Sequence, residues 1–227
     1  MKKISILLFF MIPVMINPAR AQETPENREF RKIIVSGKIL VQVNRSDHFL
    51  VEIKPEEITE KCLVYEIKQG TLTLKLLGSA SCKSKATVNI SCPYLDEIEV
   101  SGRAEIAFGN VLQGDSMFVK VSTGAKAYLD LDVKYLQLRL SEGGMARLEG
   151  YANEQLISGF TNSVCSAWEL EGEEVEVNVA SNAIAKVNAQ QRIRATAGSG
   201  GYIGIKGDPE EKDIDPKSYG QIEFLDE

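Results

Sequence analysis

The sequence contains a single histidine, His48, among 227 residues, and this scarcity limits the chemistry that the chain can perform. Ser-His-Asp and Cys-His catalytic arrangements need an imidazole beside the nucleophile, and one ring without partners cannot set up a base. The four cysteines form no CxxC pair, so no Cys/His zinc site has a usual spacing. A Walker loop and a dinucleotide-binding fingerprint are both missing, because GSGG at 198–201 opens no helix. We therefore expect a protein that is not an enzyme and carries no cofactor.

Long apolar runs are also scarce, and the one at the start of the chain has a specific layout. Lys2 and Lys3 precede an apolar run over residues 4–16, and residues 19–21 read Ala-Arg-Ala. This is the arrangement of a secretory signal peptide, and the run is too short to span a bilayer comfortably. We predict a signal peptide at 1–21 and an exported protein in the periplasm, at the outer-membrane surface or secreted.

Positive charge is in deficit. The formal net charge is −6, and cleavage after Ala21 would remove three cations and no acid, leaving −6 − 3 = −9. Phosphate contacts need a basic face, and anionic membranes repel an acidic protein. We expect no nucleic-acid partner and no transmembrane segment in the mature chain. A glycan or a protein at the cell surface remains as the partner class, and the oligomeric state stays open.

Helical periodicity of useful length is absent from the second half of the chain, where apolar and polar residues alternate. Leu136, Leu138 and Leu140 fall on one side of a strand, while Gln137 and Arg139 fall on the other. Short pauses of Ser, Gly or Asn separate such strands. The residues that anchor these pauses are Gly102, Gly124, Gly143, Gly159, Asn182 and Gly200. Their spacings of 22, 19, 16, 23 and 18 average about 20, a period typical of solenoids.

The pauses are interpreted as the corners of stacked coils. Gly and Asn tolerate the backbone angles that a corner needs, and Ala104, Ala125, Ala146 and Ala183 follow the corners with small side chains that suit close stacking. We predict an all-β fold, a right-handed parallel β-helix over residues 95–207. An antiparallel sandwich with Gly-rich turns is the alternative.

The two ends of the chain differ from this repeat. Residues 22–29 are expected to be a flexible N-terminus, and 30–94 an antiparallel β meander that caps the solenoid, with a hairpin turn at Gln69-Gly70. Residues 208–227 form an acidic C-terminal tail in which GQIEF is either a last strand or part of a solvated end.

Exposed aromatic residues are the candidates for ligand binding. Phe118, Tyr128, Trp168 and Tyr202 lie in different coils, and residues at equivalent positions of successive coils form a row on one face. For Trp168 the alternative is that it fills the core of an irregular coil.

Asp130 and Asp132 share a strand face about 7 Å apart and are a weak calcium candidate. The competing interpretation is a solvated charged face neutralised by Lys120, Lys126 and Lys134.

The cysteines predict one disulfide in the cap. If 63–67, 71–76 and 86–90 are meandering strands, Cys62 and Cys82 are neighbours at one end, whereas Cys92 lies at the opposite end. We predict a Cys62–Cys82 bond with Cys165 free and buried. Four free thiols remain an alternative, because pairing cannot be deduced securely from sequence.

Several segments together resemble a known family. They are FRKIIVSG at 30–37, GTLTL at 70–74, CPYLDEIEVSGRAEI from Cys92 and LQGDSM from Leu112. With the Ser/Gly-turn strands that follow, they look like the putative auto-transporter adhesin head domain, or GIN domain, over nearly the whole mature chain. The resemblance implies a β-helical envelope protein of Gram-negative bacteria and offers no catalytic residues to carry over. GFTNSVCSAW at 159–168 departs from the clean alternation and leaves the regularity of one coil in question.

These observations predict an exported, non-catalytic cell-envelope protein with an adhesin-like binding or scaffold role, acting through the outer face of a β-solenoid. Two alternatives stay open. One is a β-helical carbohydrate-active enzyme, a polysaccharide lyase or hydrolase. The other is a periplasmic structural partner of an envelope system.

Overall fold

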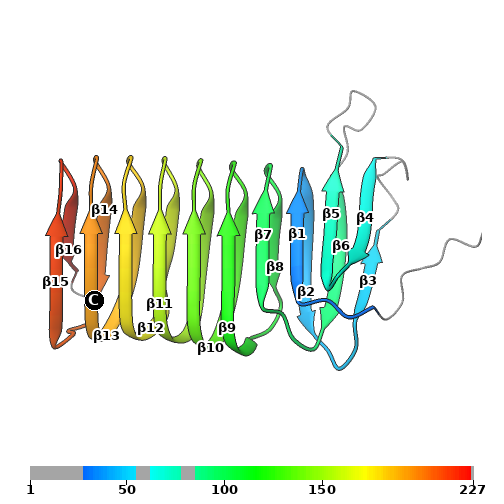
Figure 1. Cartoon of the computed structure of the whole chain (residues 1–227), viewed down its shortest axis with the longest axis horizontal. Helices are drawn as coiled ribbons and strands as arrows, with labels where there is room; N and C mark the ends of the chain where they lie inside the picture. The colour runs from blue at the N-terminus through cyan, green and yellow to red at the C-terminus, as the bar shows by residue number, and fades with distance from the viewer. Residues whose placement is uncertain (1–27, 55–61, 78–84, 226–227) are drawn as a thin grey trace, which may run out of the picture.

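The protein is a flattened β-solenoid in a computed structural model that describes residues 28–54, 62–77 and 85–225 (Figure 1). These ranges contain strands and turns, which form about seven coils in one 16-stranded sheet. Within them, no helix is long and apolar enough to cross a membrane. The predicted signal peptide and its cleavage site lie outside the described residues.

The strands are β1 (Lys32–Ser36), β2 (Ile39–Arg45), β3 (Leu50–Ile53), β4 (Leu63–Lys68), β5 (Thr71–Leu76), β6 (Ala86–Cys92), β7 (Glu97–Ser101), β8 (Glu105–Phe108), β9 (Leu112–Val121), β10 (Lys126–Leu140), β11 (Met145–Gly159), β12 (Val164–Val179), β13 (Ile184–Ala197), β14 (Tyr202–Lys206), β15 (Glu211–Pro216) and β16 (Gln221–Phe224).

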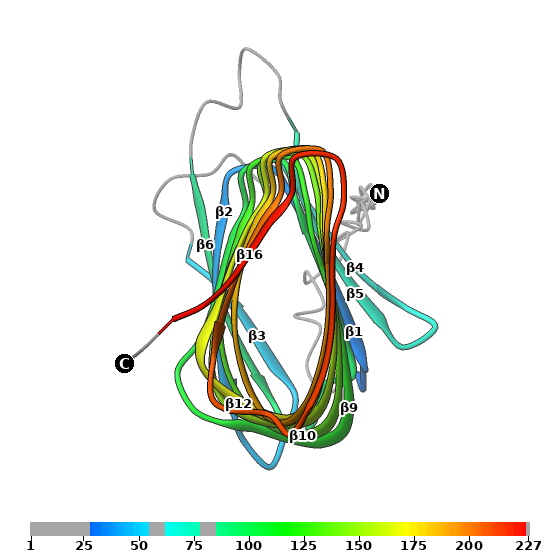
Figure 2. The same cartoon turned by 90° about the vertical axis from the view of Figure 1, so that its left-hand side faces the viewer.

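Each coil has two flat sides, joined by a tight turn at one end and a wide bend at the other (Figure 2). The long strands β10 to β13 continue through the wide bend. The first part of β10 pairs with β8 and its second part with β9, and all three run parallel. We call the side that follows each tight turn face A; it contains β6, β2, β8, the first parts of β10 to β13, β14 and β16. Face B contains β5, β1, β7, β9, the second parts of β10 to β13, and β15.

Pairs of residues with positive φ make seven of the tight turns, whereas the turn between β1 and β2 has positive φ at Gly37 alone. Thr123 and Gly124 have φ of 54° and 67°, and the backbone N–H of Ala125 donates to the Ser122 carbonyl over 3.1 Å. Two consecutive left-handed residues closed by such a bond are the geometry of a type I′ turn, which favours Gly and Asn. Equivalent pairs occur at Gly102-Arg103, Glu142-Gly143, Thr161-Asn162, Ser181-Asn182, Ser199-Gly200 and Ser218-Tyr219.

The expected corner at Gly159 is wrong by three residues. Gly159 is the last residue of β11, and the turn uses Thr161 and Asn162, with φ of 51° and 57°. Gly159 is small for a different reason, because a Cβ there would lie 3.2 Å from Ser163 Oγ. With the turn at Asn162, the spacings from Gly143 and to Asn182 become 19 and 20 residues. The period is therefore more regular than the sequence suggested.

The core lies between the two faces and consists of inward rows of apolar side chains. Ala104, Ala125 and Ala183 directly follow their turns and are fully buried. Ala146 is also buried but belongs to the next inward row, where it pairs with Ala127 and Cys165. These small residues allow successive coils to pack closely at the end of each coil that carries the tight turn.

The first coil of the chain is not the first coil of the stack. β1 pairs in parallel with both β5 and β7, and β2 pairs in parallel with both β6 and β8. The coil made by β1 and β2 therefore lies between the coil of β5 and β6 and that of β7 and β8, as Figure 1 shows.

Antiparallel pairing in the N-terminal segment is confined to two strands at the end of the stack. β4 pairs antiparallel with β5, through the hairpin at Gln69-Gly70, and β3 pairs antiparallel with β6. Together, β3 and β4 cover both free strand edges of the terminal coil, which is the capping role expected for this segment. The antiparallel meander expected over 30–94 is therefore limited to the pairings of β3 and β4. The remaining strands, β1, β2, β5 and β6, belong to parallel coils, and the sequence could not show this because alternation is the same in both pairings.

The C-terminal tail forms one more coil rather than a solvated end. β15 pairs in parallel with the second part of β13, and β16 pairs in parallel with β14. Most side chains of both strands are exposed. GQIEF thus supplies the last strand of the solenoid.

The cysteines of the described residues fall into two groups. Cys62 is buried and disulfide-bonded, whereas Cys92 and Cys165 are buried free thiols. Burial raises the pKa of both free thiols to about 12. The prediction that Cys165 is free and buried is confirmed. Cys82 lies outside the described residues, so its pairing with Cys62 stays a prediction.

Candidate binding surface

Three of the four predicted aromatic residues lie on face A. Tyr128, Trp168 and Tyr202 belong to the first part of β10, the first part of β12 and β14. Phe118 lies on face B, exposed, with its ring centroid 6.0 Å from that of Tyr135. The solenoid therefore separates Phe118 from the other three across the core.

An outward row of apolar side chains crosses four successive coils of face A. Met145 pairs with Val164, Val164 with Ile184, and Ile184 with Tyr202. Met145 and Ile184 are 43% and 40% exposed although both are apolar. The hydroxyl of Tyr202 donates to a Glu223 carboxylate oxygen over 3.1 Å, and partial burial raises the pKa of Tyr202.

Sequence reasoning missed this row because it considered aromatic residues alone. The available signal was the residue two positions after each left-handed pair, which is Met145, Val164, Ile184 and Tyr202 in four consecutive coils. Outward positions of a solvated coil are expected to be polar, so an apolar residue repeated there in successive coils is a departure that the sequence already shows.

Trp168 is partly exposed and lies outside the core, at an irregularity of β12. Its ring centroid is 5.9 Å from the ammonium nitrogens of both Lys186 and Lys206. A hollow of about 270 Å³ adjoins the ring. The residues that line it are Arg147, Leu148, Ser166, Trp168, Glu169 and Lys186.

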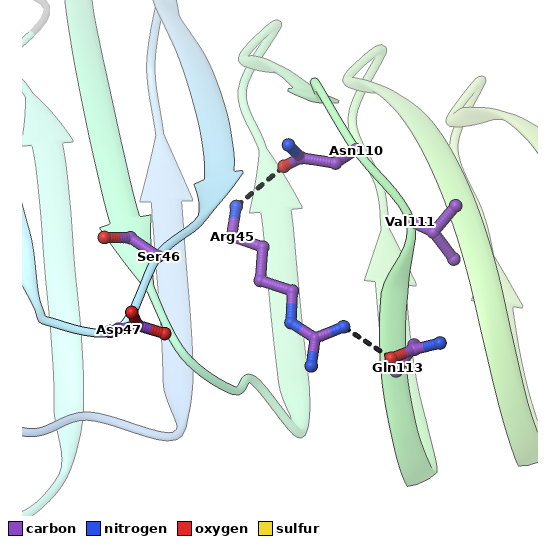
Figure 3. Close-up of a pocket in the computed structure, with 6 residues that line it drawn as sticks. All are labelled: Arg45, Ser46, Asp47, Asn110, Val111 and Gln113. Atoms are coloured by element: carbon purple, nitrogen blue, oxygen red, sulfur yellow. Dashed lines mark hydrogen bonds between the residues drawn. The ribbon is translucent and has the colours of Figure 1, made fainter.

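A second hollow, of about 560 Å³, lies where β2 ends, opposite the segment that leads into β9 (Figure 3). The Arg45 backbone N–H donates to Asn110 Oδ1 over 2.7 Å, and the Arg45 guanidinium donates to Gln113 Oε1. The Gln113 amide donates in turn to an Asp132 carboxylate oxygen over 3.0 Å. These bonds connect three successive coils at the wide bend, so Arg45, Asn110 and Gln113 of this hollow already hold coils together.

The calcium candidate gains no further ligands. Asp132 accepts the bond from Gln113, and the described residues contain no group of three or more His, Cys, Asp or Glu that could hold a metal ion. The lysine neutralisation suggested by the sequence has different partners in the structure. Lys134 pairs with Asp115 over 2.7 Å, which raises the pKa of Lys134. Lys120 lies 3.9 Å from Glu99.

Face B neutralises its own charges near the C-terminal end. Arg192 contacts Glu174 and Glu211 at 2.8 and 2.6 Å, and Arg194 contacts Glu176 and Asp213 at 3.4 and 3.2 Å. Each guanidinium thus lies between a carboxylate of the preceding coil and one of the following coil. Both arginines line a hollow of about 250 Å³ together with three glutamates, so its charged lining sums to −1.

His48 is exposed, with Nδ1 3.1 Å from Ser46 Oγ. Within the described part of the chain, this imidazole hydrogen-bonds to no carboxylate that would orient it as the base of a triad.

The chain belongs to the family described as "putative auto-transporter adhesin, head GIN domain", whose model matches residues 29–209. A crystal structure of a putative adhesin from Bacteroides fragilis NCTC 9343 is similar with a TM-score of 0.80 and 22% identity. One of a putative adhesin from Parabacteroides merdae has a TM-score of 0.67 and 19% identity. One of a putative lipid binding protein from Parabacteroides distasonis has a TM-score of 0.67 and 17% identity. Each comparison covers 88% of this chain and 94% of the other. No curated protein matches the chain.

Proposed function

We propose that the chain is an exported, non-catalytic, adhesin-like protein of the cell envelope that binds its partner through face A. The observation that carries this proposal is the apolar row of Met145, Val164, Ile184 and Tyr202, which crosses four coils on the outer surface. Family membership supports an adhesin-like role. An unbroken row across stacked coils suits an extended partner, because each coil adds one equivalent contact.

The row is long enough for an extended partner to contact several coils at once. Successive coils are separated by about 4.8 Å, so four coils give a stripe about 14 Å long, the length of several sugar units or peptide residues. Tyr128 and Trp168 flank the stripe on the same face. Aromatic rings and apolar side chains supply contact area at low entropic cost, which is why they dominate binding surfaces.

The test compares two matched surface variants of the mature chain. The face A variant carries Met145→Ser, Ile184→Ser and Tyr202→Ser, and the face B control carries Phe118→Ser, Tyr135→Ser and Leu156→Ser. Binding to a glycan array and to intact cells is measured after circular dichroism has shown that both variants are folded. Loss of binding in the face A variant alone is the expected result. Equal binding by both variants would contradict the assignment of face A.

The enzyme alternative is tested with the same samples. Incubation with host and bacterial polysaccharides is expected to leave the polymers intact. Release of unsaturated or shortened sugars that Asp130→Ala or Asp132→Ala abolishes would replace binding by lyase or hydrolase activity. Cell fractionation and N-terminal sequencing of the exported protein test the proposed location, with Gln22 expected as the first residue.

A further inference from the structure

Trp168 lies in a coil whose face A segment is longer than those of its neighbours. By register, residues 164–174 of β12 correspond to 145–154 of β11 and to 184–192 of β13. Between the same two register positions, β12 therefore uses 174 − 164 = 10 residue steps, β11 uses 154 − 145 = 9 and β13 uses 192 − 184 = 8. The strand pairing shifts around 168–170. A bulge of this kind re-aims a side chain, and here it presents Trp168 outward on face A. Trp168 is the only tryptophan of the chain.

Three cations surround this ring without carboxylate partners. Lys186 and Lys206 both lie 5.9 Å from the ring centroid, and Arg147 lines the same hollow. None of the three makes an ion pair with the described residues. The arginines of face B behave differently, since Arg192 and Arg194 are each held between two carboxylates.

The hollow is consequently a positive site on an acidic protein. Of the charged residues that line it, Arg147, Lys186 and Glu169 sum to +1, and Lys206 beside the ring adds a further positive charge, whereas the whole chain carries −6. Glu149 pairs in register with Glu169 at its border. Unpaired cations beside an aromatic ring are suited to a ligand that combines an apolar face with an anionic group.

We propose that this hollow binds acidic saccharides, that is, sugar units carrying carboxylate or sulfate groups. The C–H face of a sugar ring packs on the indole of Trp168, and its anionic group lies among Arg147, Lys186 and Lys206. A guanidinium binds carboxylate and sulfate through paired hydrogen bonds, while the ammonium groups act as point charges. The inference rests on the proposed function of face A and adds to it the chemical class of the partner. The neighbouring row from Met145 to Tyr202 would contact the adjoining units of the polymer.

The tryptophan itself reports on the site. Mature protein is titrated with polygalacturonate, which carries carboxylates, with heparin, which carries sulfates, and with dextran, which carries neither. An acidic polymer is expected to shift and quench the Trp168 emission, whereas dextran at equal mass and free sulfate at equal ionic strength are not. A response to one acidic polymer alone identifies whether carboxylate or sulfate is recognised. A response to free sulfate equal to that of the polymers would mean an ion site without saccharide recognition and would overturn the proposal.

Variants with equal changes in charge distinguish specific binding at the Trp168 hollow from nonspecific electrostatic attraction to the whole protein. The double variant Lys186→Gln/Lys206→Gln and the control Lys54→Gln/Lys75→Gln remove equal charge, and the control lysines are exposed and far from the hollow. Affinity electrophoresis in gels containing the acidic polymer is expected to show binding weakened by about tenfold or more in the first variant only. Trp168→Ala is expected to have a similar effect.

Equal weakening of polymer binding by both pairs of substitutions would refute the saccharide site. Binding to vesicles of anionic lipid is measured in parallel, and a protein that binds these vesicles but neither acidic polymer would refute it as well. If the face A variant (Met145→Ser, Ile184→Ser, Tyr202→Ser) loses cell binding while the lysine variants bind acidic polymer normally, this inference fails and the proposed function survives. If acidic polymer binds at Trp168 but cells bind equally to both surface variants, the proposed function of the row fails instead.

Discussion

At seven tight turns, from 102–103 to 218–219, two consecutive residues hold positive φ, and the free-energy cost of this conformation depends on the side chain. Gly adopts it without strain and Asn with little, whereas a β-branched residue is disfavoured. Thr123 and Thr161 adopt it at the first place of their turns, but no β-branched residue occupies the second place. In the turn at 123–124 the second place is Gly124, with φ of 67°, and a Cβ added there would have no atom closer than 3.9 Å. Space is therefore available, and backbone conformation alone decides which residues fit.

Gly124→Val is expected to lower the free energy of unfolding by about 1–3 kcal/mol, because valine must be held in a left-handed conformation. The matched control is Lys126→Val, two residues away on the outer side of β10, where a β-branched residue suits an extended strand. Thermal and urea unfolding measure both variants. Equal melting temperatures would show that the turn does not need glycine.

The buried thiols of Cys92 and Cys165 are expected to resist alkylation. Burial raises the pKa of each to about 12, so little thiolate forms in the folded protein at pH 8.5. Iodoacetamide followed by peptide mass spectrometry is expected to label both only after addition of denaturant. Labelling of Cys165 in the native protein, at the rate of a free thiol, would contradict its place in the core.

The same burial gives stability a pH dependence with a defined sign. The folded pKa of Cys165 lies above the unfolded value of about 8.5, so its contribution is complete below that pH and is lost as pH rises toward the folded value. The unfolding free energy is expected to fall less steeply between pH 8.5 and 10.5 in Cys165→Ala than in the parent chain. The substitution removes the thiol and leaves the other titrating groups in place, so the difference between the slopes isolates Cys165.

At the scale of strands, much of the fold followed from local pattern. Alternation at Leu136, Leu138 and Leu140 correctly indicated a strand with one buried side, and small residues after the turns indicated stacking. Gly159 misled because glycine marks both left-handed turns and close approaches, and here it serves the second purpose. The alternation also cannot tell whether strands pair parallel or antiparallel, since both place successive side chains on opposite faces.

The binding surface was predictable in part. The aromatic candidates on face A came from the sequence, but their grouping did not, because it depends on the register between coils. The bulge at Trp168 is an example: Ala167 and Leu170 both point inward, and two outward residues stand between them. A single sequence shows that a residue is inserted there without showing which side chain projects beside Lys186 and Lys206.

The terminal strand β15 is held to β13 by ion pairs, so its order is expected to depend on charge. Arg192→Gln combined with Arg194→Gln removes the contacts to Glu211 and Asp213. Hydrogen exchange of residues 211–216 is expected to accelerate in this variant, and in the parent chain at high salt, because exposed ion pairs are screened. The control Lys134→Gln breaks the exposed pair with Asp115 on another coil and leaves exchange at 211–216 unchanged.

Acid is expected to have the same effect as salt on this strand. The Arg192 guanidinium lowers the pKa of Glu211, so the contact stabilises β15 above the unfolded pKa of the carboxyl and is lost as pH falls through the lower folded value. Exchange is compared with the intrinsic amide rate at each pH, because that rate itself falls in acid. Unchanged protection at 211–216 in acid and in the double variant would mean that backbone pairing alone fixes this strand.

At the scale of the whole molecule, the two ends of the stack protect their strand edges differently. Antiparallel strands β3 and β4 cover the terminal coil at one end. At the other end β15 and β16 pair with no further strand of residues 28–54, 62–77 and 85–225 on their outer sides, where Asp213, Asp215 and Pro216 lie along β15. Charged residues and proline on an edge strand disfavour addition of a further strand, so this end is expected to resist growth into fibres.

The interleaved first coil makes the two chain ends unequal in their importance for folding. Deleting residues 208–227 removes β15 and β16, which form the last coil, and a stack of coils loses one set of neighbour contacts. Deleting residues 28–45 removes β1 and β2, which separate the coil of β5 and β6 from that of β7 and β8, so both neighbours lose their partners. The C-terminal deletion is expected to unfold cooperatively at a reduced temperature, whereas the N-terminal deletion is expected to lose cooperative unfolding. Differential scanning calorimetry distinguishes these results, and equal transitions for the two deletions would show that β1 and β2 are dispensable to the stack.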